Sequence, residues 1–535
     1  MLIRRSFAAL ASSEVYDVAI VGAGMVGAAV AALLRSNAFT ADMRIAIIDQ
    51  QPPPMELTVS QYPDMRVSTI TPANMQLLQQ TGAWQELAQL APTFQHMQVW
   101  EHAGPGFISW QASDIGHPHM GCVVENRLLQ AALLRAAKAG SSSSSSSSSS
   151  SAGCLDFICP GTVKALRLPG SGSQASVPPL AGSTTGGTTG STAGSTTGGT
   201  GGSTGGSTSG SLAELQLADG SSLHCRLVVA ADGARSRVRE MAGLRTVGWS
   251  YNQRGLVASV ATAEPSDTAW QRFLPTGPLA LLPVRGGFSN VVWTVPPEMA
   301  RQLEGLSSSQ FADAVNDALQ PDPATFSSSS SSSAGTPSAF RSGIAPLDAA
   351  AAAAASALQQ LGGPLGGAVL GQLLNPGGAL GFGGEAGQGS YWRRPPLVEG
   401  WVGSSPKSFP LQLQHSGRYV APRLALVGDA AHSIHPMAGQ GVNLGLGDAA
   451  ALAETLAHAR ELGRDLGDLA LLQSRYEAPC QRANMTMIAA LEVLWRGFGV
   501  QAGLAGAARS AGLGLLNGVG PVKNRIMQYA MGLTQ

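Results

Sequence analysis

The stretch "DVAIVGAGMVGAAVAALL", from Asp17 to Leu34, decides the fold of the first part of the chain. Its opening run, Asp17 to Val21, has the apolar, β-branched content of a buried parallel strand. Gly22, Gly24 and Gly27 then follow in G-x-G-x-x-G spacing before an alanine-rich helical segment. The first glycine permits a tight turn, the second admits a pyrophosphate to the backbone, and the third lets the helix pack on the strand. The stretch therefore predicts a Rossmann-like site for an adenine dinucleotide.

An acid at the end of the next expected strand supports this prediction. The segment "RIAIID" ends at Asp49, 22 residues after Gly27, where a carboxylate can hold the ribose hydroxyls. The helix that opens at the glycines supplies backbone amides and a partial positive charge for the phosphate. This first fingerprint does not distinguish NAD from FAD.

Two later segments indicate FAD. In "LALVGDAAHSIHPMAGQGVNLGLGDAA", from Leu424 to Ala450, an apolar strand ends at Gly428 and Asp429, and a glycine turn opens a second helix. In "LVVAADGARSRVRE", Asp232 follows another apolar strand. The acid at Asp429 can bind the ribitol or hold water against the pyrophosphate, and the positive end of the helix that follows can stabilise the negative charge of a reduced flavin. A nicotinamide dinucleotide would not need this second set of acidic and glycine-rich loops.

Composition excludes several other classes of protein. The 33 basic and 33 acidic side chains cancel, and basic residues form no block of five or more, so we expect no nucleic-acid partner. The five cysteines have no regular spacing, which argues against a secreted disulfide framework. No run of eighteen apolar residues predicts a membrane-spanning helix.

Several segments are unlike a folded domain. Residues 141–151 are all serine, residues 170–211 are almost entirely Gly, Ser, Thr and Ala, and residues 326–390 combine serine, alanine and glycine runs. They contain too little apolar surface to offset the entropy of ordering them, so we expect disordered surface inserts. The alanine run is alternatively a short helix. Residues 1–14, "MLIRRSFAALASSE", are acid-poor up to Glu14 and predict a mitochondrial presequence.

The three motifs together resemble those of the FAD-dependent aromatic hydroxylases with the p-hydroxybenzoate hydroxylase fold. Further segments, including "DMRVSTITPANMQLLQQTGAW", "VVENRLLQAAL" and "YEAPCQRANMTMI", are similar to the ubiquinone-biosynthesis ring hydroxylases, the mitochondrial coenzyme Q monooxygenases among them. The likeness covers nearly all of the non-repetitive chain. It implies an α/β fold with a Rossmann-like FAD-binding domain, a mixed-sheet substrate domain and a helical C-terminal segment.

The resemblance also implies which residues bind FAD. Arg66 and Pro436 would lie beside the isoalloxazine, whereas the catalytic step would depend on the flavin rather than on a catalytic side chain. Asn126 stands where many relatives carry a flavin-contacting arginine, and the adjacent Arg127 leaves that contact open. The implied cofactor-binding residues are Gly22, Gly24, Gly27, Asp49, Arg66, Asp232, Gly428, Asp429, Gly439, Gly441, Val442 and Asn443.

The activity that the resemblance implies is hydroxylation of a polyprenyl-hydroxybenzoate at ring carbon 5, on the way to ubiquinone, with dioxygen as co-substrate. Electrons would come from a ferredoxin and its reductase, with NADPH as an alternative. The protein would contact the matrix face of the inner mitochondrial membrane peripherally, beside other ubiquinone-biosynthesis proteins. Two alternatives remain: a hydroxylase of another phenol, and an FAD-stabilised, non-catalytic subunit of a quinone-synthesis complex.

Some patterns admit more than one structural interpretation. His432, His435 and Asp429 could form a two-histidine, one-carboxylate metal site, but Asp429 fits a flavin role better, so we expect no metal. The four tryptophans of the middle region are expected to pack in a core rather than to line an aromatic pocket. For the C-terminal stripe we prefer a core-packing helix to one that docks on a membrane or partner. The four tryptophans are Trp249, Trp270, Trp293 and Trp401. The C-terminal stripe consists of the apolar residues Val522, Ile526, Ala530 and Leu533, which recur at helical spacing.

The expected domain organisation follows from these assignments. A discontinuous FAD-binding domain would comprise residues 15–140, 212–245 and 415–458, with a low-complexity insert region at 141–211. The substrate domain would span 246–414, and the helical C-terminal segment 459–535.

Overall fold

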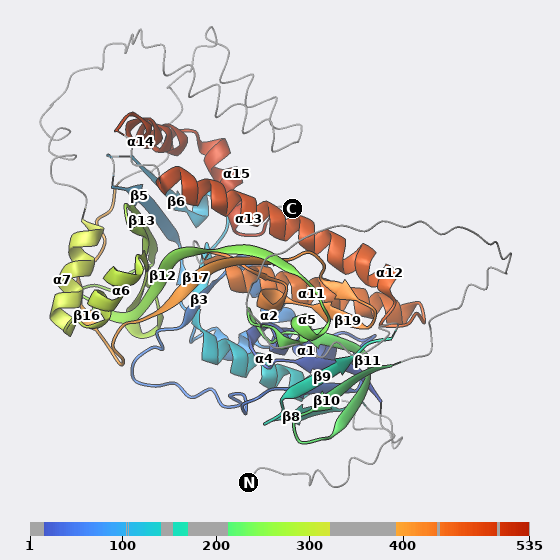
Figure 1. The fold of residues 1–535 in the computed structure, drawn as a ribbon. Helices are drawn as coiled ribbons and strands as arrows, with labels where there is room; N and C mark the ends of the chain where they lie inside the picture. The colour runs from blue at the N-terminus through green and yellow to red at the C-terminus, as the bar shows by residue number, and fades with distance from the viewer. Residues whose placement is uncertain are drawn as a thin grey trace, which may run out of the picture.

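The computed structural model describes residues 15–102, 104, 106–140, 153–169, 212–320, 392–435, 439–499 and 503–533. The expected presequence, the three low-complexity runs and Pro436 lie outside these residues. Figure 1 shows two large sheets side by side, with the C-terminal helices running across both. The α/β class, the p-hydroxybenzoate hydroxylase type of fold and the helical C-terminal segment are confirmed.

The first sheet has the topology of a dinucleotide-binding fold. Its strands lie in the order β18-β19-β11-β1-β2-β8, parallel from β19 to β8, with β9 and β10 added as an antiparallel extension of β11. The strand order reverses at β1, and ligands of open α/β sheets bind at such a switch point. The strands are β1 (Tyr16–Val21), β2 (Ile45–Ile48), β8 (Leu155–Ile158), β9 (Val163–Arg167), β10 (Ala213–Leu217), β11 (Ser222–Ala230), β18 (Val420–Ala421) and β19 (Leu424–Leu426).

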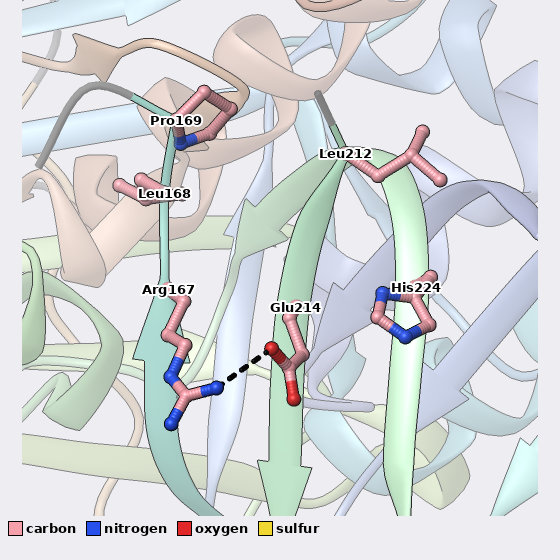
Figure 2. A pocket seen from close by; sticks show the side chains of 6 residues that line it. All are labelled: Arg167, Leu168, Pro169, Leu212, Glu214 and His224. Atoms are coloured by element: carbon pink, nitrogen blue, oxygen red, sulfur yellow. Dashed lines mark hydrogen bonds and ion pairs between the residues drawn. The ribbon is translucent and has the colours of Figure 1, made fainter. Parts of the chain in front are cut away.

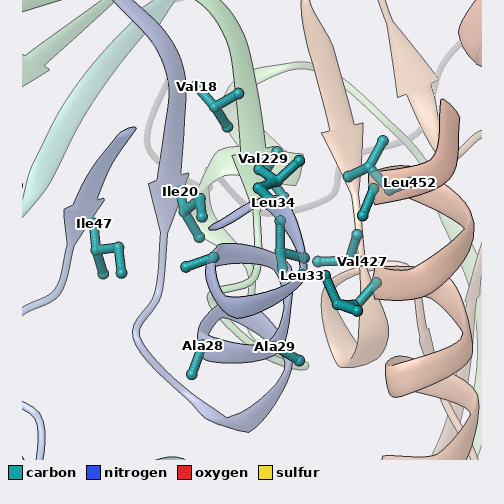
Figure 3. Close-up of a cluster of buried hydrophobic side chains, with 14 of the residues drawn as sticks. Val18, Ile20, Ala28, Ala29, Leu33, Leu34, Ile47, Val229, Val427 and Leu452 are labelled. Carbon is teal, nitrogen blue, oxygen red and sulfur yellow. The ribbon is translucent and has the colours of Figure 1, made fainter. Parts of the chain in front are cut away.

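Helices α1 (Met25–Ser36), α4 (Asn126–Gly140) and α11 (Gln440–Glu461) pack on this sheet and on one another. The alanines of α1 permit a close approach to the strands and to α11. A Cβ added at Gly445 of α11 would lie 2.6 Å from Val26, so this contact requires glycine. Figure 3 shows the resulting core, which includes Val18, Ile20, Ile47 and Val229 from the strands, Ala28, Ala29, Leu33 and Leu34 from α1, and Val427 and Leu452 near and on α11.

The second sheet is mostly antiparallel and has the order β20-β17-β12-β15-β14-β13-β5-β6, with β16 paired to β12. Helices α6 (Pro297–Glu304) and α7 (Ser308–Leu319) pack against it. Its strands are β5 (His96–Glu101), β6 (Phe107–Gln111), β12 (Thr246–Thr262), β13 (Thr268–Leu274), β14 (Gly277–Pro283), β15 (Ser289–Val295), β16 (Val398–Trp401), β17 (Lys407–Ser416) and β20 (His432–Ser433).

Two features differ from the expected domain boundaries. Strands β5 and β6 belong to the second sheet, although residues 15–140 were assigned to the FAD-binding domain. The reason is tertiary, because β5 pairs in parallel with β13, about 170 residues later in the chain. Strands β8 and β9 lie within the expected insert region 141–211, between its two low-complexity runs.

The tryptophan prediction is confirmed for three of the four residues. Trp270 and Trp293 are buried in the core of the second sheet, and Trp401 packs against the same cluster while partly exposed. Trp249 differs, since 46% of it is exposed on β12. It therefore belongs neither to the core nor to an enclosed aromatic pocket.

A small third sheet, in the order β3-β7-β4, connects the two large sheets. Its strands are β3 (Val67–Ile70), β4 (Thr93–Phe94) and β7 (Gly121–Glu125), and α2 (Pro72–Gln80) and α3 (Trp84–Leu87) lie beside it. The remaining elements are short turns and the C-terminal helices: η2 (Ala112–Ile115), η3 (Arg285–Gly287), η4 (Gly428–Ala430), η6 (Leu472–Glu477), α5 (Arg237–Met241), α12 (Leu469–Leu471), α13 (Ala478–Gly499), α14 (Gly503–Gly518) and α15 (Gly520–Ala530).

Helices α14 and α15 cover β6, the last strand of the second sheet (Figure 1). Backbone N–H groups of this edge donate to side chains instead of to another strand: Gly106 to Ser510 Oγ at 2.7 Å and Ser109 to Asn517 Oδ1 at 3.2 Å. The buried Lys523 donates to the Ser109 carbonyl at 3.0 Å. These bonds satisfy an edge that would otherwise be open to association.

The face of α15 that packs inward is not the apolar stripe that we expected from the sequence to do so. Lys523 and Met527 are buried, whereas Ile526 is 44% exposed and Leu533, just beyond the helix, is 36% exposed. The stripe that contains Ile526 and Leu533 therefore faces outward, and the core-packing interpretation is wrong for it. The inward position of Lys523 follows from its bond to the strand edge, which the spacing of apolar residues does not reveal. Among the described residues, none of the helices has the length and hydropathy needed to cross a bilayer.

Candidate functional site

Four loops predicted to bind the cofactor meet at one edge of the first sheet. Gly22 follows β1, Asp49 follows β2, Asp232 lies just beyond β11, and Gly428 lies just beyond β19. Since these strands are parallel neighbours, their carboxyl ends lie along the same edge. Segments about 400 residues apart in sequence thus line the crevice where open α/β sheets bind ligands.

The glycine loop has the geometry that a pyrophosphate site requires. At Gly22 the φ angle is +106°, and an added Cβ would lie 2.3 Å from the Ala231 carbonyl oxygen. At Gly27 an added Cβ would lie 2.0 Å from the Gly22 carbonyl oxygen. At Gly24, by contrast, no described atom lies within 4 Å of the added Cβ. The first and third glycines are thus required by the protein itself, whereas the second faces open space.

The N-terminus of α1 completes this part of the site. Within the described residues no side chain caps the helix, and its first turn contains no acid. The amide groups at that end therefore remain available to an anion, with the helix dipole favouring negative charge. These features fit a bound dinucleotide.

Asp49 is held against the glycine loop. Its Oδ2 accepts a hydrogen bond from the Ala23 backbone at 2.7 Å, and its Oδ1 accepts one from Gln51 at 2.9 Å. Gln130 of α4 donates to the Ala23 carbonyl at 2.8 Å and supports the loop from the other side. Sequence reasoning missed Gln130, because an isolated glutamine on a helix gives no local signal.

The two motif aspartates lie in adjacent loops. Asp232 Oδ2 accepts from the backbone of Arg237 and Val238, at 2.8 and 3.2 Å, and so caps α5. Its Oδ1 is buried without a hydrogen-bond partner among the described residues. Asp429 is exposed at the open end of its turn. Arg239, also missed from sequence, donates to the carbonyls of Ala234 at 3.0 Å and Ala430 at 2.8 Å, and so joins the two loops.

The second glycine turn is tied to the small sheet. Gly439 has a φ of +63° at the start of α11, and no described side chain caps this helix. Asn443 Oδ1 accepts from the backbone of Thr71 at 3.0 Å and from Asn74 Nδ2 at 2.9 Å. Its Nδ2 donates to the carbonyls of Thr69 at 2.8 Å and Gly439 at 3.2 Å. The Asn443 side chain is thus a structural clamp between α11 and the β3–α2 segment.

The remaining predicted residues occupy different positions. Gly441 faces open space, and Val442 packs on the main core. Arg66 is 75% exposed, with its Nε 4.0 Å from Asp64. Asn126 donates through its backbone to the Arg66 carbonyl at 3.0 Å and accepts from Ser68 Oγ at 2.7 Å, while Arg127 is exposed.

Comparison with known proteins identifies the family. A family model described as an FAD binding domain matches residues 206–341 and 405–488. The human "Ubiquinone biosynthesis monooxygenase COQ6, mitochondrial" is 31% identical over 529 residues, covering 98% of this chain and 94% of that protein. The "3-demethoxyubiquinol 3-hydroxylase" of Escherichia coli is 28% identical and covers 97% of this chain and 98% of that protein.

The chain belongs to the family of FAD-dependent ubiquinone-biosynthesis monooxygenases. This monooxygenase is an FAD-dependent oxidoreductase. Its fold is similar to that of PqsL, a probable FAD-dependent monooxygenase from Pseudomonas aeruginosa, with a TM-score of 0.56 at 17% identity over 94% of this chain and 99% of that one.

The two histidines of the loop that follows β19, His432 and His435, contact other side chains of the protein. His432 Nε2 lies 2.6 Å from Asp448 Oδ2, and the His435 ring packs edge-on against Tyr251 at 4.9 Å between centroids. Burial lowers the pKa of His435 to about 4, so this ring is neutral at physiological pH. Among the residues that the monooxygenase structure describes, His, Cys, Asp and Glu side chains form no cluster that could hold a metal ion.

The monooxygenase also has a surface hollow, which lies away from the loops at the carboxyl ends of the first sheet. Figure 2 shows it between β9, β10 and β11, where Arg167 pairs with Glu214 at 3.2 Å beside His224. His224 lies near the amino end of β11, whereas Asp232 follows the carboxyl end. The hollow is therefore at the opposite end of the strand from the cofactor crevice.

Proposed function

We propose that the protein hydroxylates the aromatic ring of a polyprenyl-hydroxybenzoate intermediate in ubiquinone biosynthesis. The observation that carries this proposal is the full-length similarity to a ubiquinone biosynthesis monooxygenase and to a 3-demethoxyubiquinol 3-hydroxylase. The loops proposed to bind the cofactor lie at one sheet edge, which supports it. Ring carbon 5 is the position implied by the sequence resemblance. Because the bacterial relative is named for a different ring position, the experiment must determine the position directly.

The cofactor would lie along the four strand ends. Gly22, Gly24 and Gly27, with the amides of α1, would hold the pyrophosphate, and Asp49 would hold the ribose. The open face at Gly24 and the short bond from Asp49 to the glycine loop support this arrangement. The two aspartate loops and the second glycine turn would hold the flavin half, through Asp232, Gly428, Asp429, Gly439, Gly441, Val442 and Asn443, with Arg66 and Pro436 beside the isoalloxazine.

Bound FAD supplies the activation of dioxygen and the transfer of one oxygen atom to an electron-rich ring. The chain's own contribution is to position and stabilise. The amide end of α11 would favour negative charge on the reduced ring system, since the helix dipole is positive there. The clamp of Asn443 on β3 supports this role, because it fixes the end of the helix.

The electron donor would be a ferredoxin with its reductase. The absence of a second dinucleotide fingerprint in the sequence supports an external donor. In an anaerobic stopped-flow assay, reduced ferredoxin should bleach the flavin absorbance faster than an equal concentration of NADPH. Faster bleaching by NADPH would make NADPH the donor.

Localisation in the mitochondrion is supported by the name of the human relative and by the acid-poor first fourteen residues. We propose further that helices α13 to α15 rest on the matrix face of the inner membrane, next to other proteins of the pathway. Of the four basic residues in 483–533, Arg496 and Arg525 are exposed, which suits an anionic surface, whereas Lys523 is buried and Arg509 pairs with Glu101. Exposed apolar side chains on these elements are Met485, Val493, Leu494, Leu515, Val519, Ile526, Tyr529 and Leu533.

Replacing both Ile526 and Leu533 by aspartate is expected to weaken binding to vesicles containing anionic phospholipid by about tenfold. Two apolar contacts with the membrane are lost, and each aspartate adds a negative charge that the anionic phospholipid repels. Cosedimentation with phosphatidylglycerol vesicles measures this. Phe39→Asp is the control, because Phe39 is also an exposed apolar residue, at 50% exposure, but lies after α1. Equal vesicle binding by the double variant and the wild type would contradict the proposed membrane face.

The proposed function is tested by removing the protein from cells and analysing prenylated lipids by mass spectrometry. The expected result is accumulation of prenylated hydroxybenzoate derivatives that lack one ring hydroxyl, with the missing position read from fragmentation. Re-expression of the wild-type chain should clear them. Unchanged ubiquinone and intermediate levels would contradict the assignment and direct attention to another phenol. If re-expression of a variant that cannot bind FAD also removed the accumulated intermediates, the protein would instead be a non-catalytic subunit.

A further inference from the structure

A carboxylate is buried behind the second cofactor loop. Asp448 lies in the third turn of α11, among alanine, leucine and glycine, and is 1% exposed. A buried carboxylate is costly unless several donors satisfy it. Asp448 therefore requires specific partners, and no step of the proposed function so far uses it.

Three nitrogen donors, together with the Cys480 thiol, surround this carboxylate. Asp448 Oδ2 accepts from the Gly428 backbone at 2.9 Å and lies 2.6 Å from His432 Nε2. Its Oδ1 accepts from Asn484 Nδ2 of α13 at 3.1 Å. Burial alone would lower the pKa of His432, but the charge and hydrogen bond of Asp448, with a smaller contribution from Asp429, raise it. Because an ionised carboxylate can only accept, Nε2 carries the N–H at this distance and donates a hydrogen bond to Asp448.

The two loop partners lie on either side of Asp429. Gly428 opens turn η4 with a φ of +58°, and His432 begins β20. One carboxylate oxygen therefore holds both ends of the loop 428–432 from its buried side, while Asp429 is exposed on the other. The loop also lies close to α1, since a Cβ added at Gly428 would be 3.0 Å from Val26.

We propose that Asp448 and His432 form a buried positioning pair that sets the direction of Asp429 toward the cofactor. This inference rests on the proposed role of Asp429 in binding FAD. Neither member of the pair is assigned a contact with the cofactor. The pair acts by fixing a short loop at two points, so that the exposed carboxylate is held in one orientation before FAD binds.

The first test compares two substitutions of His432 in the purified holoprotein. His432→Gln keeps an N–H donor at about the reach of Nε2, whereas His432→Leu removes it. The dissociation constant of FAD, measured by flavin fluorescence on dilution, is expected to rise about tenfold for His432→Leu and to change by less than about threefold for His432→Gln. Glu454→Gln, on the exposed face of the same helix, should match the wild type.

The second test distinguishes positioning from general stabilisation by a double-mutant cycle with Asp429→Ala. If His432 acts through Asp429, then His432→Leu combined with Asp429→Ala should bind FAD no more than about twofold more weakly than Asp429→Ala alone. Additive losses would overturn the inference, as would an Asp429→Ala variant with unchanged affinity. Should His432→Leu fail to fold, the glutamine variant decides: FAD binding like the wild type supports the donor bond, and a loss of about tenfold overturns it. Because the readout is FAD affinity, a failure here is distinguishable from a failure of the ring-hydroxylation assignment.

Discussion

Gly24→Ala is expected to leave the protein folded but to weaken FAD binding by about tenfold or more. The backbone at Gly24 has a φ of −60° and a ψ of 179°, which alanine adopts without strain. No described atom lies within 4 Å of the added methyl group. The space it would enter is the one in which the second glycine of the fingerprint lets a pyrophosphate approach the backbone.

Gly22→Ala provides the contrast to this variant. It combines a φ of +106° with a Cβ 2.3 Å from the Ala231 carbonyl oxygen, so the fold itself should be lost or greatly destabilised. Circular dichroism and thermal unfolding without FAD, followed by FAD titration, separate the two effects. Wild-type affinity in Gly24→Ala would show that the pyrophosphate does not lie over this loop.

Asn443→Leu is expected to lower the free energy of unfolding by about 3–5 kcal/mol, because several buried partners lose a hydrogen bond at a cost of about 1–3 kcal/mol each. The Thr71 N–H and the Asn74 amide lose their acceptor, and the Thr69 carbonyl loses its donor. FAD affinity should fall as well, since the start of α11 is no longer tied to β3. Denaturant unfolding and FAD titration measure the two losses.

Asn316→Leu is the matched control for that substitution. Asn316 also makes paired side-chain bonds to backbone, donating to the Val398 carbonyl and accepting from its N–H, both at 2.8 Å, but in the second sheet. Its loss should destabilise the protein without changing FAD affinity. If both variants lowered FAD affinity equally, the effect of Asn443 would be general destabilisation and not the loss of a clamp at the site.

The loops proposed to bind the cofactor could be located from the sequence because each is a local pattern. A short apolar strand followed by glycine or aspartate at Gly22, Asp49, Asp232 and Gly428 specifies a strand end and a turn without reference to the rest of the chain. The parallel sheet then brings these ends to one edge. The fold class and the cofactor therefore followed from residues that are close in sequence.

The parts that could not be predicted depend on contacts between distant segments. Gln130 and Arg239 support the loops through bonds to backbone carbonyls, which no spacing in the sequence reveals. Strand β5 joins the second sheet by pairing with β13, and the bond from Lys523 to β6 turns the expected apolar stripe of α15 outward. Asp448 did give a signal, as an acid within a stretch of small and apolar residues of α11, but only the tertiary structure shows its partners.

The most direct test of the central claim is the fate of labelled dioxygen. Purified protein containing reduced FAD is mixed with a prenylated hydroxybenzoate and oxygen-18 gas, and the lipid is analysed by mass spectrometry. We expect a product that has gained one labelled oxygen atom on the ring, in an amount that matches the flavin reoxidised. Reoxidation that yields hydrogen peroxide and leaves the ring unlabelled, with the substrate bound, would contradict the assignment as its ring hydroxylase.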